Sequence, residues 1–469
     1  MSREKEFVKN SIVLSFGTVV PKLASVVTLP IITSCLTKAE YGTYDLITVL
    51  VSLILPVATL QMQAAAFRFL LKVKGDVSEQ KRVITNITLF TIPVSIIVLF
   101  IFYWVLNLSR TTRLLVTLYF FVDIILNTFK QIARGLGHNE VYSFGTIINS
   151  FIEMLLTALL LLGLDKGLNG VLISMASSQL CAILFVMAKI RLLSYIDIRL
   201  FAISQIREML AYSWPMIPNS LSSWVMRLSD RLILTWVLGV EANAVYAVAN
   251  KLPNIFSLFQ SSFSLAWQEN ATVAVKDSDS SRYYGKMFED IFDVLVGFMA
   301  ILIAFTPIIF KILIRGDYDD AYNHMPILYL AVMFAAISSF LGGIYIAHMK
   351  SRDIGITTTV AAGINFTFNI IFVRVIGIYA ASLSTLISYM ILSGYRMIDV
   401  QKFQKISFNY KKIIIELIIL SLFSFACFMR TTIIDIINMI ASLIVAYLIN
   451  RNLVNMIIDK TIMKIKTRN

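Results

Sequence analysis

The sequence has few charged residues, and this scarcity excludes a soluble fold. Asp, Glu, Lys and Arg together make up 15% of the 469 residues, whereas about a quarter is usual in a soluble domain. Hydrophobic residues make up 58%, and the mean hydropathy is +0.79. A chain of this composition belongs in a lipid bilayer.

Residues that bind metals or form disulfides are also scarce. The chain has 3 Cys and 3 His, without the spacing of a zinc, heme or redox site. No phosphate-binding G-x-x-x-x-G-K-[ST] run occurs. The sequence therefore predicts no metal site, no cofactor and no disulfide, and the short loops described below point away from an enzyme. The six residues are Cys35, Cys181, Cys427, His138, His324 and His348.

What the chain does have is a series of long apolar stretches. A hydrocarbon core of about 30 Å needs about 20 mainly apolar residues per helix, and helices satisfy their own backbone polar groups there. The stretches predict an all-α polytopic integral membrane protein with about fourteen transmembrane helices, about twelve being the alternative. The predicted spans are 11–36, 46–67, 84–106, 114–134, 143–164, 168–188, 210–238, 244–268, 288–314, 325–347, 354–374, 377–395, 413–429 and 433–449.

The basic residues between these stretches are distributed unevenly. Most of the 41 Lys and Arg residues fall in segments on the same side as the amino terminus, including 68–82, 396–412 and the tail after 450. Because short cytoplasmic loops carry the excess of Lys and Arg, both termini are predicted to be cytoplasmic. The net charge of +13 then requires no nucleic acid, since basic loops lie beside anionic headgroups.

Two similar runs indicate that the chain is duplicated. Residues 36–46 (LTKAEYGTYDL) and 238–248 (LGVEANAVYAV) each follow a long span, turn around a Glu and re-enter the membrane with a Tyr. The basic, amphipathic stretch 189–207 separates two sets of six spans, and parallel halves around a central cavity are a recurring transporter plan. The predicted domains are a first six-helix bundle (1–190), a cytoplasmic linker (191–209), a second six-helix bundle (210–400), and an extra helix pair with a basic tail (401–469).

Four runs resemble the signature sequences of a known family. They are LTKAEYGTY at 36–44, YSWPMIPNSL at 212–221, SDR at 229–231 and YAVANKLP at 246–253. They make the chain similar to the bacterial polysaccharide flippases, often called Wzx-type, of the multidrug/oligosaccharidyl-lipid/polysaccharide exporter (MOP) superfamily. The resemblance covers residues 1–400 in order and spacing, and 212–253 is its most specific part.

This resemblance implies two six-helix bundles around a cavity in a bacterial plasma (inner) membrane. The substrate would be an undecaprenyl-diphosphate-linked oligosaccharide, which a flippase moves from the cytoplasmic to the outer leaflet. The product would serve a surface polysaccharide such as O-antigen, capsule or exopolysaccharide. A polysaccharide polymerase and chain-length machinery would be partners, and the extra helix pair would have no assigned role.

Ionisable residues inside the predicted spans are candidate substrate ligands, because each costs at least ~2.5 kcal/mol at bilayer depth. Arg227, Asp230 and Arg231 share one helical face, and Lys22 and Lys251 lie in other spans. They predict a cationic cavity in which guanidinium groups bind the diphosphate and Asp230 orients its neighbours. The alternative is a structural ion-pair cluster on that face, with both Lys side chains reaching toward headgroups.

Two carboxylates are candidates for coupling transport to an ion gradient. Asp123 and Glu153 lie within predicted spans, and a buried carboxylate that takes up a proton is a common coupling device. The alternative is that they form ion pairs with Lys22 or Arg134, and this is the interpretation that we favour.

Two other functions compete with the flippase. A drug or organic-cation exporter of the same superfamily would need net negative charge in its cavity, opposite to the excess of Lys and Arg. A membrane glycan polymerase would need a long outer loop to hold its acceptor, whereas the longest outer connection expected is about 315–324.

Overall fold

The computed structural model describes residues 3–275 and 279–466. This described part consists of helices joined by short connections and contains no strand, which confirms the predicted all-α class. Nine helices in it are long and apolar enough to cross a bilayer. Helices also occupy the remaining predicted spans, although 46–67, 210–238 and 244–268 each contain a short interruption.

The first half of the chain forms nine α-helices and three short helical turns. They are α1 (Arg3–Cys35), α2 (Lys38–Ala58), α3 (Met62–Lys72), α4 (Val77–Val105), α5 (Arg110–Gly135), α6 (Asn139–Ala158), the π-helical η1 (Leu159–Gly163), α7 (Gly167–Ile190), the 3-10 turns η2 (Leu192–Tyr195) and η3 (Ile198–Leu200), α8 (Ile203–Ser213) and α9 (Met216–Leu238).

The second half continues with eight α-helices and one further turn. They are α10 (Val240–Ala249), α11 (Lys251–Ala274), α12 (Ser280–Leu313), α13 (Asp319–Ala347), α14 (Ser351–Ile376), α15 (Tyr379–Asp399), the 3-10 turn η4 (Val400–Lys402), α16 (Tyr410–Phe428) and α17 (Thr432–Lys466).

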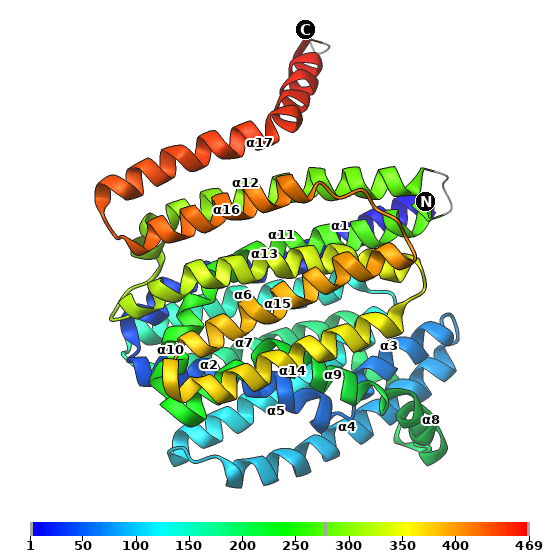
Figure 1. The fold of residues 1–469 in the computed structure, drawn as a ribbon. Coiled ribbons are helices and arrows are strands. Elements are labelled where there is room, and N and C mark those ends of the chain that lie inside the picture. Colours follow the sequence, from blue (N-terminus) through cyan, green and yellow to red (C-terminus); the bar gives the residue numbers. More distant parts are fainter. Residues whose placement is uncertain (1–2, 276–278, 467–469) are drawn as a thin grey trace. The chain divides into compact units, whose positions relative to one another are not determined.

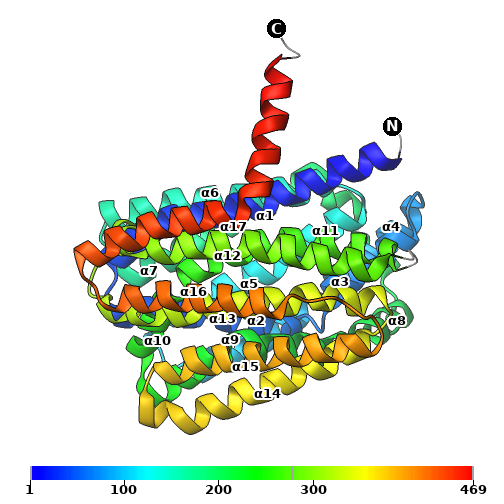
Figure 2. The same ribbon diagram turned by 45° about the horizontal axis from the view of Figure 1, so that its top comes forward.

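These helices form two compact units. Unit 1 comprises Met1–Thr235, Gly239–Ala244 and Leu313–Gly316, and unit 2 comprises Trp236–Leu238, Val245–Ile312 and Asp317–Asn469. Within unit 1, α1 packs on α6, and α5 and α6 pack on α7. Within unit 2, α13 packs between α11 and α15, and α14 packs on α15 (Figures 1 and 2). The domain boundaries inferred from the sequence stay a prediction.

Short polar side chains fix where several helices begin. Thr37 and Glu40 form a capping box at the start of α2, each accepting a hydrogen bond from the other's backbone N–H. The carboxylate of Asp76 accepts from two N–H groups in the first turn of α4, and Ser109 caps α5 in the same way. Because these caps fix where a helix begins, consecutive helices can be joined by connections of only a few residues.

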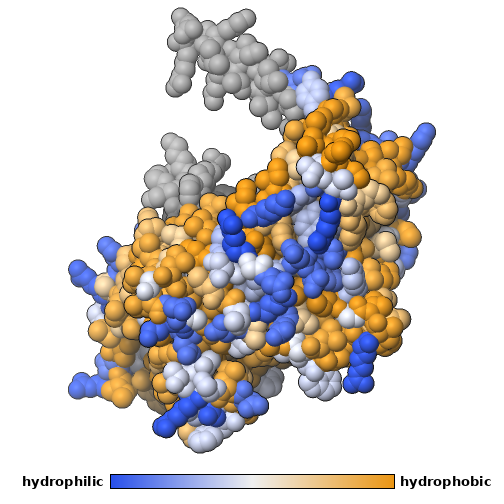
Figure 3. Space-filling view, turned by 90° about the vertical axis from the view of Figure 1, so that its left-hand side faces the viewer, coloured by the Kyte–Doolittle hydropathy of each residue, from blue (hydrophilic) through white to orange (hydrophobic). Residues whose placement is uncertain are grey.

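Large apolar side chains cover much of the surface. On α4 and α16, for example, Ile97, Phe100, Leu422 and Phe425 are each about 60% exposed. Hydrophobic residues spread over much of the side shown in Figure 3, and hydrophilic residues gather toward its middle. A surface of this kind is stable in lipid and unstable in water, so the structure is that of a multi-pass membrane protein.

The predicted span 46–67 is not one continuous helix. α2 ends at Ala58 and α3 begins at Met62, and between them Leu60 and Gln61 adopt left-handed backbone conformations (φ 49° and 58°). The helix is thus interrupted in the middle of an apolar segment, where local turns and Oγ1 of Thr59 accept hydrogen bonds from the backbone N–H groups of residues 59–62. By contrast, only Asn250, in a right-handed helical conformation, separates α10 from α11.

Candidate functional site

A buried ion pair in unit 1 joins two helices that are far apart in the sequence. Nη1 of Arg231, on α9, donates to both carboxylate oxygens of Asp45, on α2, at 2.9 and 3.0 Å. Asp45 is only 2% exposed, so the two charges interact with little screening by water. The sequence suggested Asp230 as the acidic neighbour of Arg231, and the structure supplies Asp45 in addition.

Asn243, in the first turns of α10, completes the ion-pair site. Its Nδ2 donates to the carbonyl oxygen of Gly42 at 3.1 Å and lies 3.4 Å from Oδ2 of Asp45. Asn243 is fully buried. The site thus holds one guanidinium, one carboxylate and one amide, and the amide gives Asp45 a neutral donor beside its cationic one.

The two similar runs found in the sequence meet at this site. A Cβ on Gly42 would overlap the carbonyl oxygen of Val240, so only glycine lets α2 approach the start of α10 so closely. Gly42 belongs to the first run, and Val240 and Asn243 belong to the second. The ion pair is therefore built where the two runs pack together.

The other residues of the predicted cationic cavity lie in different surroundings. Asp230 is buried on α9 beside Arg231, and Lys22 is exposed on α1. Lys251 is half-buried at the start of α11 in unit 2. Arg227 lies on α9, but its side chain is outside the described part of the structure. Their assignment as substrate ligands stays a prediction.

Asp123 is held by neutral amides. Its Oδ1 accepts from Nε2 of Gln179 at 2.8 Å, and its Oδ2 accepts from Nδ2 of Asn127 at 3.0 Å. Glu153, on α6, is close enough to Asp123 for the two carboxyl groups to interact electrostatically. The two acidic residues lie on α5 and α6, which pack together in unit 1.

The ion pairs expected for these carboxylates are absent from the described residues. The guanidinium of Arg134 lies over the rings of Phe67 and Tyr142, at 4.5 and 5.9 Å from their centroids. Lys22 is exposed on another helix. Lys130 is the cation that interacts electrostatically with Asp123, so the expected pairing of Asp123 or Glu153 with Lys22 or Arg134 is not found among the described residues.

The break between α2 and α3 creates a second polar cluster in unit 1. Nε2 of Gln61 donates to Oγ of Ser220 on α9 at 2.7 Å, and Nε2 of Gln63 donates to Oε1 of Gln61 at 3.0 Å. Oε1 of Gln63 is buried without a hydrogen-bond donor among the described residues. This cluster was not predicted from the sequence, although two Gln residues inside an apolar span are a signal that could have revealed it.

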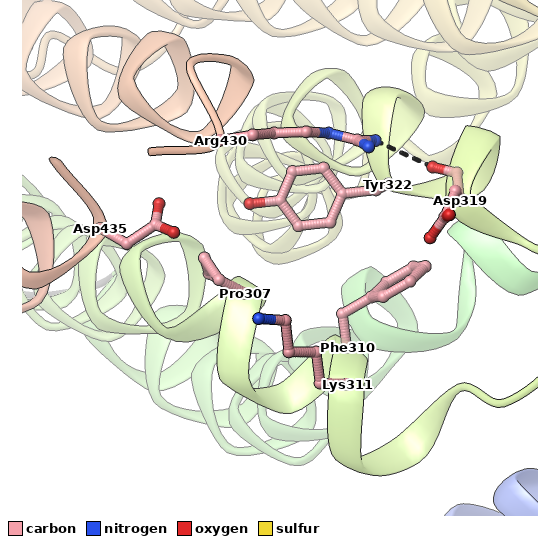
Figure 4. Close-up of a pocket in the computed structure, with 7 residues that line it drawn as sticks. All are labelled: Pro307, Phe310, Lys311, Asp319, Tyr322, Arg430 and Asp435. Atoms are coloured by element: carbon pink, nitrogen blue, oxygen red, sulfur yellow. Dashed lines mark hydrogen bonds between the residues drawn. The ribbon is translucent and has the colours of Figure 1, made fainter. Parts of the chain in front are cut away.

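A separate pocket of about 160 Å³ lies in unit 2 where α12, α13 and the α16–α17 turn meet. Figure 4 shows Lys311 and Asp435 pointing into it, with Arg430 across the ring of Tyr322. Arg430 lies 4.7 Å from that ring centroid and donates to the carbonyl oxygen of Asp319 at 2.9 Å. Arg430 has a left-handed backbone (φ 45°), so these contacts hold a strained turn in place.

This fold is shared by membrane transporters of the MOP superfamily. The structure is similar to that of the lipid II flippase MurJ in an inward closed conformation, with a TM-score of 0.70 over 94% of this chain and all of that one, at 16% identity. It is also similar to a MOP superfamily transporter from Pyrococcus furiosus, with a TM-score of 0.57 over 85% of this chain and 96% of that one, at 14% identity.

The family model described as polysaccharide biosynthesis protein matches residues 7–267, which is more than half of the chain. The chain therefore belongs to the polysaccharide biosynthesis protein family. Among curated proteins it is 24% identical over 320 residues to an uncharacterized membrane protein of Methanocaldococcus jannaschii. That match covers 64% of this chain and 61% of the relative, so the chain spans less than two thirds of the relative's length.

Proposed function

We propose that the protein is a flippase for an undecaprenyl-diphosphate-linked oligosaccharide, which it moves from the cytoplasmic to the outer leaflet of a bacterial plasma membrane. The observation that carries this proposal is the match of residues 7–267 to the polysaccharide biosynthesis family. The MOP-type fold along 94% of the chain supports it, since transporters of such folds bind their substrates within the bundle.

In this proposal Arg231 is a ligand of the diphosphate, with Lys22, Arg227 and Lys251 as further cations. Arg231 already binds one anion, the carboxylate of Asp45. A diphosphate presents the same kind of acceptor oxygens in larger number and can take the place of that carboxylate. Asp45 then keeps the amide of Asn243 as its neighbour.

Two carboxyl groups elsewhere in unit 1 are the candidates for coupling transport to a proton gradient. They are Asp123 and Glu153, which interact electrostatically with each other within candidate membrane spans. The hydrogen-bond donors to Asp123 are the amides of Asn127 and Gln179. No enzymatic step is needed, and the bundle itself moves the lipid-linked headgroup.

The rival function is export of a drug or organic cation. Asp45 weakens the charge argument against it, because Arg231 is neutralised within the described site. Family membership, rather than net charge, now favours the flippase. A membrane glycan polymerase is disfavoured, because the connection between α12 and α13 spans only Ile314 to Tyr318 and offers no platform for an acceptor.

The test measures lipid-linked oligosaccharide in a cell whose surface polysaccharide depends on this gene. When compared at equal membrane abundance with wild type, Arg231→Gln should trap the intermediate in the inner leaflet, and Arg231→Lys should restore export only in part, because Lys provides charge without a planar fork. Surface-exposed Arg110→Gln is the matched control. Normal export from a well-expressed Arg231→Gln protein would remove Arg231 from the mechanism, and unchanged intermediates after gene deletion would refute the flippase.

A further inference from the structure

The segment that follows α7 and ends with α8, residues 191–213, packs against α4. It contains the predicted linker 191–209, and from here on we call the whole segment the linker. Oγ1 of Thr85 donates to the carbonyl oxygen of Tyr195 at 3.1 Å and accepts from the backbone N–H of Asp197 at 3.0 Å. Thr85 is fully buried. One side chain thus fixes the backbone on both sides of the turn that joins η2 to η3.

Asn86, the next residue of α4, holds the following part of the linker. Its Nδ2 donates to the carbonyl oxygen of Leu200 at 3.0 Å and to Oε1 of Gln205 at 2.8 Å. Its Oδ1 accepts from the backbone N–H of Ala202 at 2.7 Å. Asn86 is also fully buried, so these bonds are shielded from water. The linker is an ordered element of unit 1, packed on α3 and α4 through α8 (Figure 1).

Despite this firm attachment, the linker exposes large apolar side chains. Leu193, Ile198 and Ile203 are 70, 74 and 70% exposed, respectively. α7 is a candidate membrane span that ends at Ile190, so the linker starts where the chain leaves the bilayer. Exposing these three aliphatic side chains to water costs free energy, whereas placing them among lipid acyl chains is favourable.

Exposed basic residues alternate with these apolar ones. Arg191, Arg199 and Arg207 are all exposed along the linker. Its two acidic residues are Asp197 and Glu208, and the carboxylate of Asp197 already accepts from the backbone N–H of Arg199. Guanidinium groups at a membrane surface bind lipid phosphates, and each basic residue adds attraction to an anionic leaflet.

We propose that the linker is a binding surface for anionic phospholipids of the adjoining leaflet. Leu193, Ile198 and Ile203 insert among the acyl chains, while Arg191, Arg199 and Arg207 bind the phosphate groups. The firm attachment by Thr85 and Asn86 then holds the end of α7 and the start of α9 at a fixed depth. This role concerns the surrounding bilayer rather than the transported substrate, so it stands apart from the proposed flippase activity.

The first measurement counts bound phosphatidylglycerol by native mass spectrometry, using the full-length protein released from nanodiscs of phosphatidylcholine and phosphatidylglycerol. The triple variant Arg191→Gln, Arg199→Gln, Arg207→Gln should retain about tenfold less phosphatidylglycerol than wild type. The matched control, Lys72→Gln, Lys74→Gln, Lys405→Gln, removes the same charge from exposed positions elsewhere and should bind like wild type. Equal losses in both variants would overturn the proposal, because they would show attraction by total charge only.

The second measurement reports depth and does not depend on the arginines. A nitroxide label at Ile198→Cys or Ile203→Cys, in a protein whose three native Cys are replaced by Ala, should collide more with oxygen than with a water-soluble nickel complex. A label at Lys74→Cys, which is exposed outside the linker, gives the aqueous reference. Equal nickel accessibility at all three sites would place the linker in water and overturn the proposal. Retained phosphatidylglycerol in the triple variant would do the same.

Discussion

Nη1 of Arg231 lies 2.9 and 3.0 Å from the two carboxylate oxygens of Asp45, across 186 positions of sequence. This pair links α2 to α9 within unit 1. A buried ion pair is costly to break from one side, because the remaining charge stays in a poorly solvating site. The pair is therefore a structural link between the two helices, and its role as a binding site for the substrate's diphosphate stays a proposal.

A double-mutant cycle separates the two roles of this pair. Arg231→Gln or Asp45→Asn alone should lower the free energy of unfolding by ~3–5 kcal/mol, and the double variant should lose less than the sum. Thermal unfolding of purified protein in detergent measures the stability, and transport is assayed in parallel. Additive losses would show that the two side chains do not interact. Full transport in a stable double variant would leave the pair with a structural role only.

Gly42 should tolerate no side chain. Gly42→Ala places a methyl group on the carbonyl oxygen of Val240, and backbone cannot move aside as a side-chain tip can, so we expect a loss of ~2 kcal/mol or more. Gly363→Ala, on α14, is the matched control, since nothing lies within 4 Å of its added Cβ. That change should stabilise its helix slightly. Equal melting temperatures for the two variants would refute the close approach of α2 and α10.

Arg396 is a buried cation with neutral partners. Its position in 396–412 predicted a cytoplasmic loop charge, but it is 4% exposed on α15. Its Nη1 donates to the carbonyl oxygen of Ser338 at 3.0 Å, and its Nη2 donates to Oγ1 of Thr358 at 2.8 Å and of Thr357 at 3.0 Å. The guanidinium thus ties α13, α14 and α15 together in unit 2.

Replacing Arg396 should therefore reduce stability rather than transport as such. Arg396→Met leaves several buried acceptors without donors and should cost ~2–4 kcal/mol. Arg396→Lys should also be defective, because three donors on a point charge cannot reach acceptors on two neighbouring helices. Membrane abundance and melting temperature are the measurements. Exposed Arg352→Met is the control, and equal behaviour of Arg396→Met and Arg352→Met would contradict this role.

Reporter fusions test the predicted orientation. A cytoplasm-active reporter should be active after Asn469 and within 68–82, and inactive near Asp319, because the basic residues concentrate on the side of the first two sites. Reporters active only outside the cytoplasm should give the reverse pattern. A carboxy terminus outside the cell would require an odd number of spans and would exclude the plan of paired six-helix bundles.

The sequence by itself determined the class and the helical segments of this protein. A helix that crosses a bilayer needs about 20 apolar residues, and such a stretch is visible in the sequence itself. The predicted spans 84–106 and 433–449, for example, correspond to α4 and α17. The runs at 36–44 and 212–253 led to the family, which the match over residues 7–267 confirms. The starts of α2 and α4 also depend on local sequence, because the side chains of Thr37 and Asp76 cap them.

Only the tertiary structure decided which polar groups meet. Helical periodicity relates residues three or four apart on one helix, so it grouped Asp230 and Arg231 with Arg227. It could not predict Asp45 as a partner, because Asp45 lies on another helix, 186 positions from Arg231. The partners of Asn86 in the linker lie more than 100 positions away, and Arg396 bonds to two other helices. Such pairings depend on which helix faces pack together, and many faces of similar apolar composition compete for that packing. The left-handed residues Leu60 and Gln61 broke the span 46–67 for the same reason, since the contact of Gln61 with Ser220 on α9 holds a conformation that local sequence does not favour.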